Sequence, residues 1–310
     1  MPLTDLARAA SIGECMIELA PREEGLYALG MGGDTLNTAV YMARLGMKVD
    51  YLTAMGDDPY SQRMIAAWAE EGVGVDKVRR LPGRLPGLHL IETDARGERR
   101  FHYWRDRAPA RELFKLDDTA GLLADIAGYA LVYLSGISLS LYGDDGRAAL
   151  IGALDEVRRR GGRVAFDSNY RPRNWPDAGA ARTAMGELMK RADIALLSFD
   201  DERALWSDGS PSDTAKRVAA LGPAEVVVKN GPEPVVLIVA GAKPMTIAPE
   251  AQPRPRDTTA AGDSFNAAYL AARQAGASPA DSARAGHRLA AAVIQHPGAI
   301  IPRHAMPAAI

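Results

Sequence analysis

From about residue 117 onward the chain alternates short apolar segments with longer segments of helical periodicity. This alternation restricts the possible folds more than any other feature of the sequence. We expect helices over residues 118–127, 144–160, 178–190 and 212–221. We expect strands over residues 131–134, 163–167, 194–198, 225–229 and 235–240. Because repeated strand–helix units place successive strands side by side, the pattern predicts an α/β fold, a mostly parallel sheet with helices on both faces. The connections are short, so we expect the 310 residues to form one domain.

The N-terminal part predicts a first strand over 11–19 and, after a glycine-rich link, a helix over 35–45. Asp34 precedes this helix as a candidate cap, and Gly46 follows it as a stop signal. The next expected elements are a strand over 49–54 and a helix over 60–71, and the chain closes with two helices over 263–295 that separate near 276–279.

A β-hairpin is predicted between residues 88 and 105, where the strand–helix rhythm is interrupted. Its arms cover 88–93 and 99–105, and the turn lies at 94–97. Because side chains alternate along a strand, one face of the second arm carries Arg99, Phe101, Tyr103 and Arg105. A hairpin inserted in an α/β pattern indicates a flap over a site.

Charge and composition exclude several classes of protein. The formal charge of −2 gives no reason to expect nucleic-acid or membrane partners, and no apolar run is long enough to span a bilayer. The single cysteine, Cys15, excludes an internal disulfide and is expected to be a small buried apolar residue. The first ten residues lack the apolar core of a signal peptide, so we expect a cytoplasmic protein.

Polar residues lie at the carboxyl ends of several predicted strands, namely Asp167, Asn169, Ser198, Lys229 and Asn230. In open parallel sheets, ligands bind beyond the carboxyl ends of the strands. Any one of these side chains could merely satisfy backbone groups in a loop, and Lys229 could be a capped strand end. Their convergence on one sheet edge predicts a site there.

The stretch 257–266 places two small residues and a glycine directly before Asp263, and an alanine-rich helix follows. Small residues let the backbone approach a ligand, and the free N–H groups of a first helical turn suit a phosphate. A carboxylate at the edge of such a site can accept the proton of a hydroxyl that attacks the phosphate. Asp263 could instead be an ordinary helix cap.

Motifs of other enzyme classes are missing. The sequence lacks G-x-x-x-x-G-K-[ST], the phosphate loop of common NTPases. It also lacks a G-x-G-x-x-G that opens a helix after a strand, and this disfavours a nicotinamide-dependent dehydrogenase. Neither H-E-x-x-H nor G-x-S-x-G occurs, and the histidines show no metal-ligand spacing.

Two markers resemble those of the ribokinase-like sugar kinases: Gly32-Gly33 before a helix, and residues 257–263, which are similar to the family's late D-T-x-G-A-G-D. The likeness extends over essentially the whole chain. Within that family the chain is most similar to the bacterial subgroup that phosphorylates 2-keto-3-deoxygluconate. The segments that carry this likeness are 13–18, 32–38, 85–88, 91–94, 103–105, 134–138, 169–173 and 298–303. The resemblance implies a single ribokinase-like domain over 1–310, with lid strands from about 16–32 and 85–107.

The implied activity is ATP-dependent phosphorylation of the C6 hydroxyl of 2-keto-3-deoxygluconate, in sugar-acid catabolism of the Entner–Doudoroff type. Asp263 would be the base, with the backbone N–H groups of Ala260, Ala261 and Gly262 as the anion hole. The residues implied for the sugar acid are Gly33, Asp34, Asn37, His89, Tyr103, Arg105, Arg171 and Asp263. The residues implied for ATP are Asn169, Ser198, Lys229, Gly231, Thr258, Ala260, Gly262 and His287, and Mg²⁺ is expected on the phosphates, held largely through waters.

Charge supports an acidic sugar independently of the resemblance. A guanidinium binds a carboxylate bidentately, so Arg105 on the hairpin and Arg171 after a strand favour a sugar acid over a neutral sugar. Arg105 alone could equally be a solvated edge of the lid, and Asp34 alone could be only a cap.

The chain departs from the family pattern at three places. The N-x-x-E position is occupied by residues 198–201, with Glu202 next, so Asp201 and Glu202 both remain candidates for influencing the metal. Ala260 replaces a glycine and restricts φ. His89 stands where relatives often carry tyrosine, and could keep a hydrogen bond or add charge near a carboxylate.

Two other functions stay open at this stage: a kinase of the same family acting on another sugar or a nucleoside, and a non-catalytic sugar-acid sensor. Leu90 and Trp104 point away from the site on the hairpin, so we expect pairing with a second copy, giving a homo-oligomer that is at least a dimer.

Overall fold

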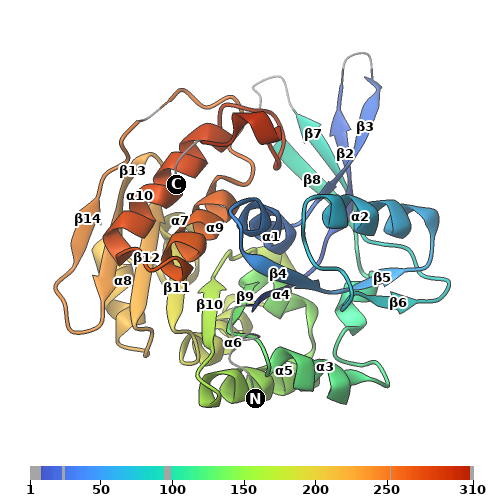
Figure 1. The fold of residues 1–310 in the computed structure, drawn as a ribbon, viewed down its shortest axis with the longest axis horizontal. Coiled ribbons are helices and arrows are strands. Elements are labelled where there is room, and N and C mark those ends of the chain that lie inside the picture. The colour runs from blue at the N-terminus through green and yellow to red at the C-terminus, as the bar shows by residue number, and fades with distance from the viewer. Residues whose placement is uncertain (1–7, 23–24, 94–98, 252, 308–310) are drawn as a thin grey trace.

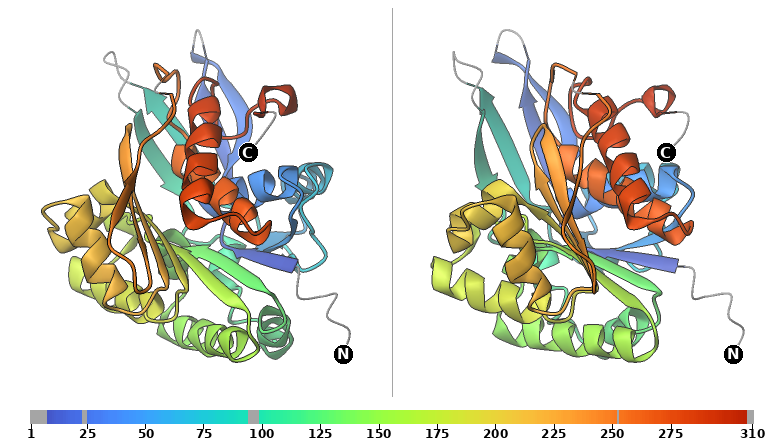
Figure 2. Two further views of the ribbon diagram at one scale, coloured as in Figure 1. Left: turned by 60° about the vertical axis from the view of Figure 1, so that its left-hand side comes forward. Right: turned by 90° about the vertical axis from the view of Figure 1, so that its left-hand side faces the viewer.

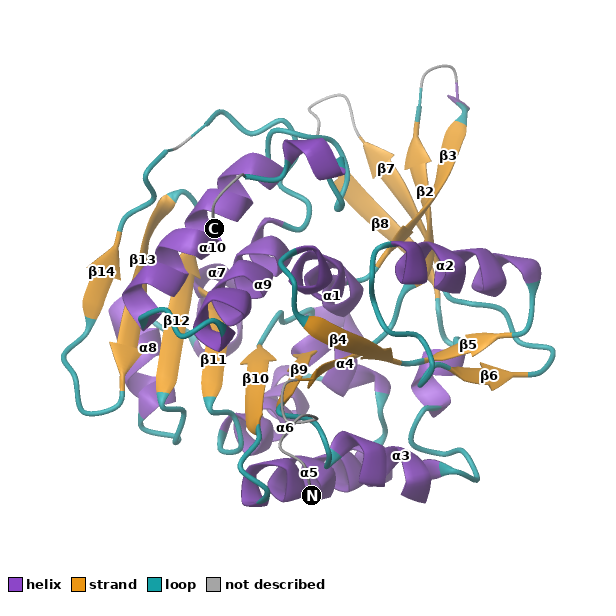
Figure 3. Cartoon of the chain, viewed as in Figure 1, coloured by secondary structure: helices purple, strands orange, loops and turns teal. Residues whose placement is uncertain are grey.

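The computed structural model describes residues 8–22, 25–93, 99–251 and 253–307, which contain an eight-stranded main sheet (Figures 1 and 3). The strand order is β14-β13-β12-β11-β10-β9-β1-β4. Every neighbouring pair from β12 through β4 is parallel, and β13 and β14 extend the sheet antiparallel. The bounds are β1 Arg8–Ile12, β4 Lys48–Leu52, β9 Leu131–Ser135, β10 Arg163–Asp167, β11 Ile194–Ser198, β12 Glu225–Asn230, β13 Glu233–Val239 and β14 Met245–Ile247.

Helices cover both faces of the main sheet, which confirms the predicted fold class (Figure 2). The helices of one face are α3 Thr119–Ile126, α4 Gly136–Leu141, α5 Asp144–Arg159, α6 Ala178–Met189, α7 Phe199–Trp206 and α8 Pro211–Ala219. The helices of the other face are α1 Asp34–Arg44, α2 Pro59–Glu70, α9 Ala261–Gln274 and α10 Pro279–Val293.

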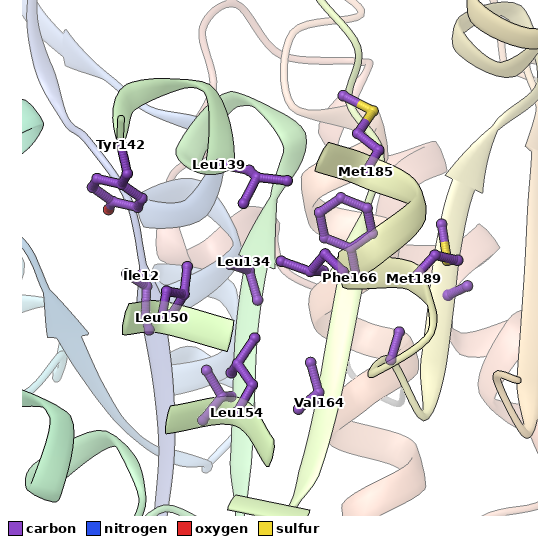
Figure 4. Packing of buried hydrophobic residues seen from close by; sticks show 14 of the residues in the cluster. Ile12, Leu134, Leu139, Tyr142, Leu150, Leu154, Val164, Phe166, Met185 and Met189 are labelled. Atoms are coloured by element: carbon purple, nitrogen blue, oxygen red, sulfur yellow. The ribbon is translucent and has the colours of Figure 1, made fainter. Parts of the chain in front are cut away.

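Two apolar cores lie between these layers. Because side chains alternate along a strand, Val164 and Phe166 of β10 enter the core with α5 and α6, whereas Ala165 between them enters the core with α1 and α9. Figure 4 shows the first core, where Leu150 and Leu154 of α5 pack beside strands β1, β9 and β10. Across the described ranges, no helix has the length and apolar character needed to cross a membrane.

A second sheet of four strands projects beyond the main sheet and is called the small sheet below (Figures 1 and 2). Its order is β3-β2-β7-β8, with β2 and β7 parallel and the two outer pairs antiparallel. The predicted hairpin arms are confirmed as β7 and β8, while the predicted turn at 94–97 lies outside the described residues. The bounds are β2 Met16–Pro21, β3 Tyr27–Gly32, β7 Leu88–Thr93 and β8 Arg99–Trp104, and a separate pair is β5 Ala54–Gly56 with β6 Arg79–Leu81.

The predicted first strand over 11–19 is wrong, because this segment forms two strands in different sheets. The chain leaves the main sheet after β1 and enters the small sheet at β2. At the link, a Cβ on Gly13 would lie 2.1 Å from the Thr35 Oγ1 atom, so only glycine fits there. Helices α4 and α7 were not predicted; each is short and begins directly after a strand.

Both residues proposed as helix caps occupy other positions. Gly33 is the N-cap of α1, and Asp34 is the first helical residue and makes no capping hydrogen bond. Ala260 is the N-cap of α9, so Asp263 lies within the first turn. Neither carboxylate is committed to capping, and both are available for other contacts.

Candidate active site

A cavity of about 840 Å³ lies where the carboxyl ends of the main-sheet strands meet the small sheet. It brings together most of the predicted site residues, from segments far apart in the chain. These are Gly33, Asp34, Asn37, His89, Tyr103, Arg105, Asn169, Arg171, Ser198, Thr258, Ala260, Ala261, Gly262 and Asp263.

Asp263 lies on the cavity wall in the first turn of α9, where its Oδ2 accepts a hydrogen bond of 2.8 Å from the Asn37 Nδ2. The pKa of Asp263 is raised to about 7, mainly by burial and next by the negative charge of Asp34, whose effect is larger than the opposing effect of the Asn37 hydrogen bond. A carboxyl group with a pKa near 7 is better suited to accept a proton at neutral pH.

The predicted anion hole is partly occupied by the protein itself. The Ala261 N–H donates to the Thr258 carbonyl at 3.2 Å, so this amide already has a partner. Ala260 has φ 59°, in the left-handed region, so alanine is tolerated here at some conformational cost. The N–H groups of Ala260 and Gly262 have no backbone acceptor among the described residues and remain available for a phosphate.

Asn169 connects the end of β10 to the start of α1. Its Nδ2 donates to Asp34 Oδ2 at 2.6 Å, and its backbone N–H donates to Asp167 Oδ1 at 3.1 Å. The sequence had grouped Asn169 with the nucleotide residues. In the structure Asn169 lines the cavity, and its side-chain amide contacts Asp34, one of the residues predicted for the sugar.

Lys229 lies behind the anion hole and not on the cavity wall. Its Nζ donates to Asp167 Oδ2 at 3.0 Å and to Asn266 Oδ1 at 2.8 Å. A Cβ on Gly262 would lie 3.5 Å from this Nζ, so the ammonium group is close to the free amide of Gly262. Asn266 was missed by the sequence analysis, although it is one helical turn after Gly262 and shares its face of α9.

Gly231 and His287, both predicted to bind the nucleotide, lie away from the cavity wall. Gly231 follows β12 with φ 57°, a turn conformation. His287 is buried in α10, where its Nε2 lies 3.0 Å from the Ile247 carbonyl and its ring packs edge-on against Phe265. Burial lowers the pKa of His287, so it supplies a neutral ring to the core.

The small sheet contributes aromatic and charged groups to the cavity. His89 is buried and packs against the rings of Phe101 and Tyr103, and its Nε2 lies 3.0 Å from Glu18 Oε2. Arg173 reaches this wall from the segment that follows β10, with its guanidinium 3.9 Å from the centre of the Tyr103 ring. The contact with the Glu18 carboxylate is compatible with both roles left open for His89, a hydrogen bond and a charge near a carboxylate.

Each predicted arginine already has a carboxylate of its own chain. Arg105 forms a close ion pair with Glu14, and Arg171 lies 3.2 Å from Asp201. Glu14, Glu18 and Arg173 also line the cavity and were missed. The period-two spacing of Glu14, Met16 and Glu18, all of which reach the cavity, was the available signal.

Among the described residues, no group of three acidic, histidine or cysteine side chains could hold a metal ion directly. Asp200 and Asp201 line the cavity, whereas Glu202 is buried and pairs with Arg217. Of the two candidates from the sequence, Asp201 is therefore the one that reaches the site.

Comparison with known proteins agrees with this geometry. The chain matches the model of the pfkB family carbohydrate kinases over residues 6–306. This protein belongs to the pfkB family of carbohydrate kinases. The resemblance inferred from its two glycine-containing markers is thus confirmed.

This pfkB-family kinase is similar to two curated proteins named 2-dehydro-3-deoxygluconokinase. It is 44% identical to that of Escherichia coli strain K12 over 307 residues, covering 97% of this chain and 99% of the relative. It is 44% identical to that of Dickeya dadantii over 305 residues, covering 96% and 98%.

Solved structures show the same fold. A 2-dehydro-3-deoxygluconokinase from Thermotoga maritima has a TM-score of 0.81 at 20% identity, covering 95% of each chain. A putative ribokinase II from Escherichia coli in complex with ATP and Mg²⁺ has a TM-score of 0.82 at 21% identity, covering 95% of this pfkB-family chain and 94% of the other.

Proposed function

We propose that this kinase transfers the terminal phosphoryl group of ATP to the C6 hydroxyl of 2-keto-3-deoxygluconate (2-dehydro-3-deoxygluconate), giving the 6-phosphate. The observation that carries the proposal is the 44% identity, over nearly the full length of both chains, to proteins named for this activity. The cavity supports it, because a buried carboxylate, free amide donors and several cationic side chains meet there.

In the proposed reaction, the Asp263 carboxylate accepts the proton of the C6 hydroxyl as its oxygen bonds to the terminal phosphorus and the bond to ADP breaks. Asn37 holds Asp263 in place. The amides of Ala260 and Gly262, with the ammonium group of Lys229 behind them, stabilise the charge on the transferred phosphoryl group. Phosphoryl transfer depends mainly on position and charge, and these groups supply both.

Mg²⁺ is part of the proposal. The residues present fit a cation held mostly by phosphates and water, because the nearby carboxylates Asp200 and Asp201 line the cavity without forming a ligand cage. A bound magnesium ion neutralises charge on the nucleotide phosphates. Ser198 and Thr258, which also line the cavity, are proposed to contact the nucleotide.

We further propose that the small sheet acts as a lid over the sugar acid, with Arg105 and Arg171 binding its carboxylate and Gly33, Asp34, His89 and Tyr103 bordering it. A cytoplasmic location follows from the use of ATP. The outer face of the small sheet exposes 62% of Trp104 and 54% of Leu29, which supports a dimer that pairs two such faces.

The test is to measure kcat/KM with 2-keto-3-deoxygluconate, fructose, ribose and adenosine, following ADP release. A clear preference for the sugar acid is expected, and Asp263→Ala is expected to lower kcat by on the order of 10²–10⁴ while the sugar acid still binds. A preference for a neutral substrate would favour another kinase of the family. Binding of the sugar acid without ATP consumption by the unmodified protein would favour a sensor.

A further inference from the structure

Glu14 is a buried carboxylate on the cavity wall that the proposed reaction does not use. It lies in the link between β1 and β2, and the residue is 4% exposed. Two glycines make room for it: a Cβ on Gly33 would lie 2.3 Å from the Glu14 carbonyl oxygen, and a Cβ on Gly87 would lie 2.9 Å from Glu14 Oε1. The backbone and the side chain of Glu14 are therefore both tightly held.

The partner of Glu14 is Arg105, at the end of the small sheet. Arg105 Nη2 donates to Glu14 Oε2, and the two side chains are 10% and 2% exposed. Burial raises the pKa of Glu14 more than the guanidinium lowers it. This pair is much less exposed than Arg171 and Asp201, whose side chains are 41% and 20% exposed, so its charges are less screened by water.

Each member of the pair keeps a buried polar atom without a hydrogen-bond partner among the described residues, namely Glu14 Oε1 and Arg105 Nε. One other cavity residue shares this property, His89 through its Nδ1, and it also lies at the small-sheet end. Buried polar atoms are nearly always satisfied in the working state of a protein. The unused donor Arg105 Nε and the unused acceptor Glu14 Oε1, beside the unpaired ring nitrogen of His89, therefore indicate a polar ligand that supplies the complementary groups.

We propose that Glu14 determines specificity for sugar acids: it holds the Arg105 guanidinium in place for the substrate carboxylate, and its Oε1 accepts a hydrogen bond from a hydroxyl of the same molecule. The inference rests on the proposed function and deepens it. A guanidinium has five N–H donors, so the bond to Glu14 leaves others for a carboxylate. Because Glu14 already fixes one edge of the guanidinium, Arg105 loses little freedom when the substrate binds.

Glu18 does not fit this role, although it lines the same wall. Its Oε2 lies against His89 Nε2, so its nearest partner is another side chain of the small sheet and not an arginine. Glu14 is the carboxylate that both contacts an arginine of the small sheet and keeps a buried, unused oxygen.

The experiment compares the unmodified enzyme with Glu14→Gln, which keeps the shape and removes the charge. KM for 2-keto-3-deoxygluconate is expected to rise at least tenfold, while kcat and the KM for ATP change less than threefold. Glu112→Gln is the matched control, because Glu112 pairs with Arg84 at 2.7 Å outside the cavity. The double variant Glu14→Gln/Arg105→Gln is expected to bind the sugar acid no worse than Arg105→Gln alone, because Glu14 acts largely through Arg105.

An unchanged KM for the sugar acid in Glu14→Gln would overturn the inference while the proposed function stands. Equal rises in both KM values together with a lower Tm would also overturn it, because they would assign Glu14 a purely structural role. If Glu14→Gln does not fold, Glu14→Asp is tested in its place. This variant keeps the charge but moves the carboxylate away from Arg105, and the same selective rise in the KM for the sugar acid is expected. Failure of the unmodified enzyme to phosphorylate the sugar acid would refute the proposed function and this inference together.

Discussion

Replacing Asp263 by asparagine is expected to stabilise the protein at neutral pH while it removes the catalytic base. The pKa of Asp263 is raised from 3.8 to about 7, a difference of about three pH units. At 1.36 kcal/mol per unit, ionising this buried carboxyl group costs the folded state about 4 kcal/mol above pH 7. Asparagine is never charged and can still accept a hydrogen bond from Asn37, so the variant avoids this cost.

The pH dependence has a definite sign. Between pH 4 and pH 7 the folded protein keeps a proton on Asp263 that the unfolded chain has released. The contribution of Asp263 to the unfolding free energy therefore falls by about 1.4 kcal/mol per pH unit as pH rises, and it levels off above pH 7. Between pH 5 and pH 8, the free energy of unfolding of the unmodified protein should fall by about 3 kcal/mol relative to that of Asp263→Asn.

Urea unfolding of both proteins at pH 5, 6, 7 and 8 measures this difference. Asp200→Asn is the control, because Asp200 borders the same cavity but its side chain is 81% exposed. The difference in unfolding free energy between this variant and the unmodified protein should not show the steep change expected for Asp263→Asn. A stability difference between the unmodified protein and Asp263→Asn that stays constant from pH 5 to pH 8 would show that Asp263 is already ionised at pH 5. The argument from its burial and from the charge of Asp34 would then be wrong.

Two further predictions concern catalysis and assembly. Below about pH 7, kcat/KM for the sugar acid should fall tenfold per pH unit as Asp263 takes up a proton, and a flat profile down to pH 5.5 would argue against Asp263 as the base. Sedimentation should show a dimer that Trp104→Glu weakens, because this change puts a charge on the exposed apolar face of the small sheet; a monomeric unmodified protein at all concentrations would contradict the proposed pairing.

Local patterns in the sequence were sufficient for most strands and helices of the main sheet. Strands such as β10 and β11 and helices such as α5 were predicted in place, because each is set by apolar periodicity within a short window. The segment 257–263 was recognised for the same reason, since small residues and a glycine directly before a helix indicate a phosphate site without reference to the rest of the chain. The split of residues 11–19 into two strands was missed, because both halves have strand character and only the packing at Gly13 separates them.

The sequence by itself determined the α/β fold, the family and the segments that form the site, because these depend on residue types at short or fixed spacings. The tertiary structure alone decided which charges meet. Arg105 is paired with Glu14, Lys229 with Asp167, and Asp263 has its pKa raised to about 7 beside Asp34. Burial and charge–charge distances depend on segments far apart in the chain, and no local pattern contains them.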